Sequence, residues 1–570
     1  MSPPFVNSPA NDALSAGGFC SSSHPWATAA GVEMLARGGN ATDAAIATAF
    51  ALAVCEPAMS HLGGQGNMLV HMAGEGETVG IDFYACAPGA ARAGMYRWIE
   101  HPTQGDYRFL TEGDLNTTGG LSVCIPGAVW GWAYAHRRWG SIPLGTVLEP
   151  SITYARGGVP LARRMSGLVA ENRDRLARYP ASAAIFLRPD GSPRTEGEAV
   201  VQPELAQTLE RIATSGIEEF YSGEIARAIV DCVRSDGGVL SEEDLALYPE
   251  KLFRVLPPDA VSFRGYTVQC TPPQSSALLL HLLCLLDGFD FRTCDPLSPE
   301  KLHLLIEAMK LAFAERAVHI GDHAFVNVPI GGLFNPAYAA ERRRSIDPQR
   351  AQFPGPGNPW AYQAEQPDPA SLTGVMPSSA GHASCTTHHS HVDRWGNFVS
   401  ISQSLGDAFG SAMVVPGRGF FLNNAMKLFD PRPGTRVAAI APYKRPLMPC
   451  PTLVLRDGAP VMALGSPSGT RIPNAIAQVL VSVLDHGTSL QAAVDAPRVH
   501  WSGYELEAES DLPDAAKAGL SRLGHEVQYR SAKSPWFGAV QVVTRDPKTG
   551  LCQGAADPRR QGAAAGLADT

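Results

Sequence analysis

Apolar positions near the N-terminus repeat with helical spacing. A first helix is predicted over 25–37, where it opens at a proline and ends before two glycines. Asn40 can cap a second helix, predicted over 41–55, and Asp43 stands three residues on to support that cap. Since this second helix is apolar nearly all round, we expect it to be buried.

Strand-like alternation follows the two helices. A glycine-rich loop at 62–67 leads into predicted strands at 68–72 and 78–83, and the periodicity between about 120 and 350 is mainly helical. Proline, glycine, serine and alanine then dominate 352–384, which predicts an exposed, weakly ordered segment. Alternation returns in the segments 388–393, 398–402, 452–455 and 460–464. Strands flanked by helices at both ends of the chain indicate an α/β layered fold.

Composition excludes several classes of protein. The 570 residues suffice for two to four domains or one large α/β unit, and 45% of them are apolar. The net charge is −9 and no basic stripe stands out, so nucleic acid is not an expected partner. The most apolar run, 277–286, is half of a ~20-residue span, so membrane insertion is not expected either. The first 19 residues lack the features of a signal peptide, which predicts a cytoplasmic protein.

A candidate nucleophile stands where the proline-rich segment meets the first strand of a new unit. Thr386 carries a hydroxyl that is inert at neutral pH unless a base accepts its proton. If the chain breaks before Thr386, the freed α-amino group, with a pKa of about 7.7–8.0, can be that base. Two threonines at the start of a strand are ordinary β-structure on their own, so the flanking sequence has to decide.

The stretch from Thr386 to Asn397 resembles the threonine signature of the γ-glutamyltransferase family. Further stretches that resemble family motifs are 38–45, 62–66, 410–411, 422–426, 444–446, 465–472 and 556–559. The resemblance implies an α/β fold, a four-layer αββα sandwich of the N-terminal nucleophile hydrolase type. It also implies that the chain cleaves itself into a large segment, 1–385 with a flexible tail at about 352–385, and a small segment, 386–570, which remain together as a heterodimer.

The family's chemistry, carried over onto matching residues, needs no cofactor. The Thr386 hydroxyl would attack the Cys385 carbonyl, and an N→O acyl shift and ester hydrolysis would free the Thr386 amine. The same hydroxyl would then take up the acyl group of a small-molecule substrate and pass it to water or an amine acceptor. Ser468 and Gly469 align with a glycine pair whose N–H groups form the oxyanion hole. Ser404 aligns with a second threonine that hydrogen-bonds the nucleophile.

Substrate recognition departs from the family pattern. The arginine that clamps the γ-glutamyl carboxylate is Tyr84 here, and the acidic residue that takes the amine is Leu428. Other recognition positions are changed as well. The predicted substrate-binding residues are Tyr84, Gly406, Asn424, Ala425, Leu428 and Met448. We therefore expect an acyl group other than ordinary γ-glutamyl.

Several alternatives stay open at this point. Relatives with other substrates include cephalosporin acylases, oxamate amidohydrolases and carbon–carbon bond hydrolases of alkylproline antibiotic pathways. An inactive homologue that serves as a binding protein is the alternative of another class. The histidines at 388–391 do not form a metal site, because strand geometry directs His389 and His391 to one face and His388 to the other. Eleven cysteines without a C-x-x-C pair indicate neither zinc nor a disulfide framework, and a catalytic Ser466 or Ser468 has no assignable His and Asp partners. The substrate and the pairing of two heterodimers also stay open.

Overall fold

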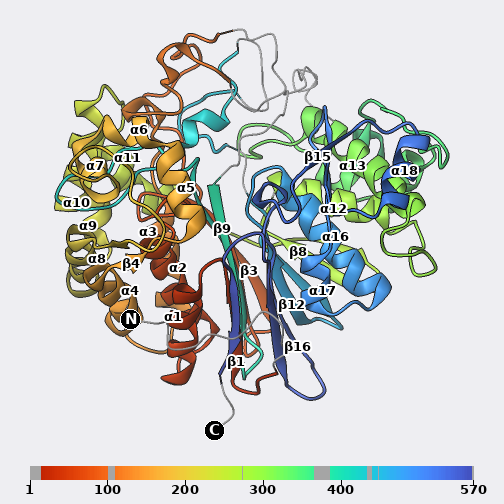
Figure 1. The fold of residues 1–570 in the computed structure, drawn as a ribbon, viewed down its shortest axis with the longest axis horizontal. Helices are drawn as coiled ribbons and strands as arrows, with labels where there is room; N and C mark the ends of the chain where they lie inside the picture. Colours follow the sequence, from red (N-terminus) through yellow and green to blue (C-terminus); the bar gives the residue numbers. More distant parts are fainter. Residues whose placement is uncertain are drawn as a thin grey trace.

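The computed structural model describes residues 14–99, 109–272, 274–364, 385–432, 439–446 and 449–567. Two antiparallel sheets stand at its centre, and a helical layer lies outside each of them (Figure 1). This arrangement confirms the predicted αββα sandwich. Helices from the N-terminal half cover one sheet, and helices from the middle and C-terminal parts of the chain cover the other (Figure 1).

The first sheet has seven strands and contains the strand that begins beside the predicted nucleophile. Their spatial order is β18 (Ala563–Gly566), β1 (Gly18–Ser22), β9 (Cys385–Asp393), β10 (Phe398–Gly406), β2 (Gln65–Met72), β3 (Glu77–Asp82) and β6 (Arg254–Leu256). The strands β9 and β10, which follow the predicted cleavage point, lie between β1 and β2, which precede it. Residues 1–385 and 386–570 therefore share one sheet and do not form separate domains.

The second sheet has six strands and packs against the first. Their order is β17 (Cys552–Ala556), β16 (Gln541–Arg545), β12 (Ala459–Gly465), β11 (Thr452–Arg456), β8 (Tyr266–Cys270) and β7 (Asp259–Phe263). Strands β12 and β16 contact β9 across the interface between the sheets. Smaller sheets contain β13 (Val499–Trp501), β14 (Leu506–Glu509) and β15 (Val527–Arg530), and β4 (Val159–Pro160) with β5 (Ala199–Val200).

The helical layers follow the predicted pattern near the N-terminus. Helix α2 (Ala41–Cys55) is buried along its whole length, and Asn40 and Asp43 form a reciprocal capping box at its start. The other helices on this side are α1 (Pro25–Ala36), α3 (Ala128–Trp139), α4 (Leu144–Gly157), α5 (Arg163–Glu171), α6 (Arg173–Ala177), α7 (Pro180–Phe186), α8 (Pro203–Ser215), α9 (Glu218–Ser222), α10 (Glu224–Ser235) and α11 (Glu242–Leu247). Helix α2 packs directly on β9 and β10 and therefore supports the strand that carries Thr386.

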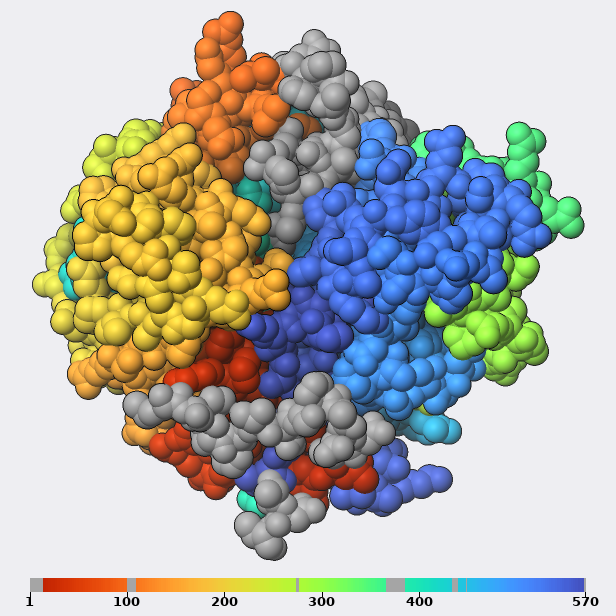
Figure 2. Space-filling model, viewed as in Figure 1, coloured from red at the N-terminus to blue at the C-terminus, as the bar shows by residue number. Residues whose placement is uncertain are grey.

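The opposite helical layer covers the six-stranded sheet. It contains α12 (Gln274–Leu286), α13 (Pro299–His319), α14 (Ile330–Leu333), α15 (Pro336–Arg343), α16 (Arg471–His486), α17 (Leu490–Asp495) and α18 (Asp514–Arg522). Figure 2 shows one face of the molecule, on which yellow residues of the N-terminal half adjoin blue residues of the C-terminal part. Within the described residues, no helix combines the length and the apolar character that crossing a membrane requires.

Two details differ from the sequence-based expectation. Strand β2 begins at Gln65, within the predicted glycine loop, because Gly66 pairs with Phe83 through two backbone hydrogen bonds. A Cβ on Gly66 would lie 2.2 Å from the Ser402 carbonyl oxygen, so the glycine permits close strand packing. Strands β6, β7 and β8 interrupt the region predicted as mainly helical. The predicted flexible tail is described up to residue 364, and 365–384 lie outside the described residues.

Candidate active site

Two hydroxyl groups meet at the start of strand β9. Thr386 pairs with Ser404 of β10, and the Thr386 hydroxyl donates a hydrogen bond of 3.1 Å to Ser404 Oγ. Ser404 Oγ in turn donates to the Cys385 carbonyl oxygen at 2.6 Å. The peptide bond predicted to break is therefore joined to the predicted nucleophile through one intermediate hydroxyl. Thr386 is only 3% exposed, which keeps this arrangement largely away from water.

A bulge in β10 aims the Ser404 hydroxyl at this carbonyl. The strand register shifts between Ser404 and Gly406, and the Gly406 N–H donates back to Ser404 Oγ at 3.0 Å. Gly406 has a φ of +100°, and a Cβ there would lie 2.3 Å from Asn424 Oδ1. A glycine is needed here because the positive φ strains other residues and because the Asn424 amide leaves no room for a Cβ. A larger side chain at 406 would displace Asn424.

Two charged side chains that the sequence analysis did not predict form hydrogen bonds with Thr386 and Thr387. Arg560 donates to the Thr386 carbonyl oxygen, and the Thr387 hydroxyl donates to Glu56 at 2.8 Å. Burial raises the pKa of Glu56, although Arg560 and the Thr387 hydroxyl oppose that shift. Arg560 directly follows the family-like stretch 556–559, which was the one available signal for it.

Cys385 does not offer a competing nucleophile. Burial raises the pKa of its thiol to about 11, with nearby charges of both signs contributing less. A thiol with that pKa stays protonated at neutral pH, and the thiolate is the reactive form. The threonine hydroxyl is therefore the group to consider at this peptide bond.

The predicted oxyanion-hole residues lie in a turn between β12 and α16. Ser468 and Gly469 have left-handed backbones with φ of +90° and +57°. The Ser468 hydroxyl donates to the Pro535 carbonyl oxygen at 3.1 Å, and the Arg471 N–H at the start of α16 donates to the Ser468 carbonyl oxygen at 3.1 Å. A turn that opens a helix presents free N–H groups and a positive dipole end, which suit a developing negative charge. Their role toward a substrate stays a prediction.

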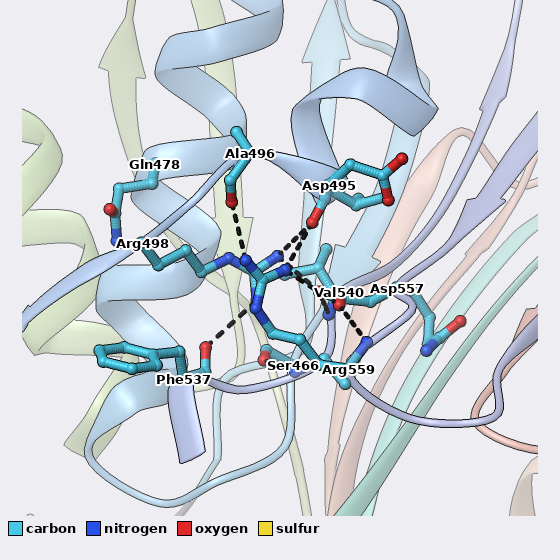
Figure 3. Close-up of polar contacts among 12 residues, drawn as sticks. Ser466, Gln478, Asp495, Ala496, Arg498, Phe537, Val540, Asp557 and Arg559 are labelled. Carbon is cyan, nitrogen blue, oxygen red and sulfur yellow. Dashed lines mark hydrogen bonds and ion pairs between the residues drawn. The ribbon is translucent and has the colours of Figure 1, made fainter. Parts of the chain in front are cut away.

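A buried ionic network lies beneath this turn (Figure 3). Asp557 accepts hydrogen bonds from Arg498 and from the Val540 N–H, the latter at 2.8 Å. The Ala539 N–H, one residue earlier, donates to Ser466 Oγ at 3.1 Å. Burial raises the pKa of Asp557, but Arg498 and Arg559 outweigh that effect and leave this pKa below its ordinary value. The C-terminal segment thereby anchors the loop that carries Ser468.

Of the residues predicted to bind substrate, Gly406 and Asn424 lie next to the hydroxyl pair and are buried. Asn424 donates to the Thr117 carbonyl oxygen at 2.9 Å and accepts from the Asp407 N–H at 2.9 Å, so both ends of its amide bond to backbone. Ala425 is buried and Leu428 is partly exposed. Met448 lies outside the described residues. Substrate binding by this group stays a prediction.

Tyr84, which replaces the expected arginine, is tied into the large segment. Its backbone N–H donates to Asp82 at 3.0 Å, and its carbonyl oxygen accepts from the Tyr248 hydroxyl at 2.9 Å. Burial raises the pKa of the Tyr84 phenol, so this side chain is neutral where a guanidinium was expected. The substitution removes a fixed positive charge from the interior.

One ion pair that the sequence did not predict lies beside these residues. Lys427 contacts Asp407, and both side chains are at least nine-tenths buried. Asp407 follows Gly406 directly, so the pair stands at the end of the strand that carries Ser404. The ion pair connects the end of β10 to the residues after Asn424, and its two charges neutralise each other.

The alternative sites weighed from the sequence have ordinary structural contacts. His388 bonds to Ser402 and Ser390 at 2.8 and 2.9 Å, whereas His389 bonds to His391 at 2.8 Å on the other face. This alternation is the one that strand geometry predicts. Ser466 and Ser468 both donate to backbone carbonyl oxygens, at 3.0 and 3.1 Å.

Two stacked antiparallel sheets between helical layers, with a buried threonine at the head of a central strand, define an N-terminal nucleophile hydrolase. The sequence model of the family described as gamma-glutamyltranspeptidase matches residues 27–567. The chain belongs to this family and is an enzyme of the N-terminal nucleophile hydrolase class.

The similar proteins include one named as an acylase and one named as a glutathione hydrolase. The chain is 38% identical over 551 residues to "Acylase ACY 1 proenzyme" of Pseudomonas sp. (strain SE83), covering 96% of this chain and 92% of that protein. It is 34% identical over 556 residues to "Glutathione hydrolase proenzyme" of Bacillus subtilis (strain 168), covering 96% and 91%. A cephalosporin acylase from Bacillus halodurans has a similar structure, with a TM-score of 0.86, 30% identity and coverage of 100% of this chain and 99% of that one.

Proposed function

We propose that this chain is a self-processing threonine hydrolase that cleaves an amide-type acyl bond through an acyl–Thr386 intermediate. The observation that carries the proposal is the hydrogen-bonded series from the Thr386 hydroxyl through Ser404 Oγ to the Cys385 carbonyl oxygen. The names of the relatives, an acylase and a glutathione hydrolase, support hydrolysis of an amide bond.

Maturation uses this geometry directly. The Thr386 oxygen attacks the Cys385 carbonyl carbon, and the hydrogen bond from Ser404 stabilises the negative charge that develops on the carbonyl oxygen. The carbon–nitrogen bond breaks as the new ester forms, and the hydroxyl proton goes to the released Thr386 nitrogen. Water then hydrolyses the ester, which leaves a carboxylate on Cys385 and a free amine on Thr386.

Catalysis repeats the attack on an external acyl group. The free amine accepts the Thr386 hydroxyl proton while that oxygen attacks the substrate carbonyl. The N–H groups of Ser468 and Gly469 are the proposed donors to the resulting oxyanion, and Arg560 holds the Thr386 backbone in place. Water is the proposed acceptor of the acyl group, with an amine as the alternative.

The substrate is proposed to carry an acyl group other than ordinary γ-glutamyl. A γ-glutamyl group brings a carboxylate and an ammonium, and binding both requires fixed opposite charges inside the protein. Tyr84, Ala425 and Leu428 supply no such charges, and Asp407 and Lys427 neutralise each other. A side-chain acyl amide of the cephalosporin-acylase kind suits this setting better than glutathione does. The cytoplasmic location stays a prediction.

A substrate panel on the purified protein tests this proposal. The rates of hydrolysis are compared for γ-glutamyl-p-nitroanilide, a glutaryl-cephalosporin amide and oxamate, with Thr386→Ala as the blank. We expect the cephalosporin amide to be turned over faster than the γ-glutamyl compound, with all turnover absent from the blank. Faster turnover of the γ-glutamyl compound would defeat the substrate part, and activity in the blank would defeat the nucleophile.

A further inference from the structure

Three buried side chains outside the active site form a His–Glu–His cluster. His303 and Glu307 stand one turn apart on α13, and His525 lies between α18 and β15. One possible ligand atom from each residue lies within 4.8 Å of the other two. His303 and Glu307 are fully buried and His525 is 7% exposed, so the cluster lies inside the helical layer.

The contacts of His303 fix which nitrogen faces the cluster. His303 Nε2 lies 2.8 Å from the Asp347 carbonyl oxygen, and His303 Nδ1 lies 2.7 Å from His525 Nε2. A carbonyl oxygen only accepts hydrogen bonds, so in the neutral ring Nε2 carries the proton and Nδ1 directs a lone pair at His525. A histidine that donates one N–H to a carbonyl and offers its other nitrogen is arranged as a typical metal ligand.

We propose that His303 Nδ1, His525 Nε2 and a carboxylate oxygen of Glu307 bind one divalent ion of the zinc class. Two nitrogens and one carboxylate oxygen form a known zinc ligand set, with water completing the tetrahedron. Two nitrogens at about 2.0–2.1 Å from zinc are about 3.3 Å apart, so the rings need to separate by about 0.6 Å. The proton that His525 Nε2 donates without the ion moves to Nδ1, and the ring stays neutral. Calcium and magnesium prefer oxygen ligands and fit this set poorly.

Lys310 sets the strength of this site. Its Nζ lies 2.6 Å from Glu307 Oε1, and it also donates to the Gln352 carbonyl oxygen at 2.9 Å. The ammonium lies over the Trp501 ring as well, 5.4 Å from its centroid. Lys310 therefore keeps partners when Glu307 turns to an ion, yet its charge repels the ion. Replacing it with an uncharged side chain is expected to tighten binding.

The ligands come from both sides of the predicted cleavage point. His303 and Glu307 precede Thr386, and His525 follows it. A bound ion would consequently connect the large and small segments after cleavage. This consequence rests on the proposed self-processing, whereas ion binding itself does not.

Metal analysis of the full-length protein tests the site. The chain is expressed in zinc-supplemented medium and purified without chelator, and zinc is measured by mass spectrometry together with the visible spectrum after exchange with cobalt. We expect one zinc per chain and the visible bands of tetrahedral cobalt. His303→Ala and His525→Ala should each weaken binding by about 100-fold or more, and Lys310→Met should strengthen it.

Matched controls separate ligand loss from general damage. His281→Gln changes another buried histidine of the same layer, whose Nδ1 bonds to the Leu333 carbonyl oxygen at 2.7 Å, and should leave zinc content unchanged. Glu307→Gln, which keeps side-chain volume, gives a second readout if an alanine variant does not fold. A zinc-free wild type, or His303→Ala and His525→Ala proteins with as much zinc as His281→Gln, would overturn the proposal. Zinc bound to a chain that stays in one piece would support the site and count against self-processing.

Discussion

The hydroxyl pair on β9 and β10 and the turn around Asn424 are neighbours, yet different parts of the chain hold them in place. Thr386 and Ser404 are positioned by strands paired on both sides within the seven-stranded sheet. Asn424 and Ala425 lie outside the sheets, at the start of a short 3-10 helix over Ala425–Leu428. Chemistry that depends on backbone placement tolerates changes of side chain, whereas recognition that depends on side chains changes with each substitution. This difference supports the proposal that the reaction is kept while the recognition of the substrate changes.

Loss of the nucleophile should have the largest effect on the catalytic side. Thr386→Ala removes the attacking oxygen, so we expect a single uncleaved band on a denaturing gel and a loss of activity of about 10⁴-fold or more. Thr386→Ser keeps a hydroxyl and should still cleave, more slowly, into bands near two-thirds and one-third of the mass. If the alanine variant were cleaved at the same bond, another residue would be the nucleophile.

The ionic network beneath the Ser468 turn should be the next most sensitive feature. Asp557→Asn leaves Arg498 and Arg559 buried without their shared carboxylate, which typically costs about 3–5 kcal/mol. Unfolding is best measured in the uncleaved Thr386→Ala background, where it involves one chain. Exposed Asp514→Asn is the matched control and should be almost neutral.

The network also predicts a pH dependence. Burial raises the pKa of Asp557, but Arg498 and Arg559 lower it by a larger amount. The pKa in the folded protein therefore lies below the unfolded value of about 3.9. Stability from this group is therefore present above the unfolded pKa and lost as the pH falls through the folded pKa. The wild-type free energy of unfolding should fall more steeply with acid than that of Asp557→Asn. Parallel acid profiles would show that Asp557 does not contribute through its charge.

The Lys427–Asp407 pair tests whether the recognition side also carries structure. Lys427→Met removes the cation that pairs with the buried Asp407 carboxylate and should cost about 3 kcal/mol in the same uncleaved background. Asp407→Asn should cost a similar amount. The double variant should recover much of the loss, since it removes both charges. Additive losses in this cycle would mean that the two side chains act independently. A change of substrate preference without a change of stability would place Lys427 in the substrate pocket.

Removing the relay hydroxyl should have a smaller effect on the chemistry. Ser404→Ala keeps the nucleophile but loses the donor to the Cys385 carbonyl, so cleavage and kcat should each slow by roughly 100-fold. Ser404→Thr retains the hydroxyl and should stay within about tenfold of the wild type. Time courses of cleavage and steady-state rates measure the two effects separately. Unchanged cleavage in the alanine variant would remove Ser404 from the maturation step.

Local sequence predicted the parts of the molecule that depend on local contacts. The cap at Asn40 and the buried helix that follows it correspond to the structure. The strands predicted at 388–393 and 398–402 lie within β9 and β10, which extend further and include Thr386 and Ser404. Periodicity missed strands β6, β7 and β8, because they are short and lie among helices. The family resemblance supplied the overall architecture, which alternation alone left at the level of an α/β layered fold.

Sequence patterns could not predict the charged side chains next to Thr386 and Thr387. Arg560 is 174 residues from Thr386, and Glu56 is 331 residues from Thr387. No periodicity relates residues that far apart. The packing of α2 on β9 brings Glu56 to the site, and the sheet order β18–β1–β9 brings Arg560 there. His303 and Glu307 have a spacing that a helix makes visible, but His525 lies 222 residues from His303. The predicted exclusion of a metal site concerned other histidines and cysteines and could not address this cluster.

The smallest expected effect concerns Ser468, and it tests directly whether backbone placement is what the chemistry needs. Ser468 holds a φ of +90°, which costs a residue with a side chain about 1 kcal/mol, and its hydroxyl bond to Pro535 returns a similar amount. Ser468→Gly should therefore change the free energy of unfolding by less than about 1 kcal/mol and kcat by less than about threefold. Ser468→Val, a branched side chain at the same φ, should be clearly less stable. If the glycine variant lost more than about tenfold in kcat while staying folded, the serine hydroxyl would itself take part in the reaction, and the distinction between backbone-held chemistry and side-chain-held recognition would fail at this turn.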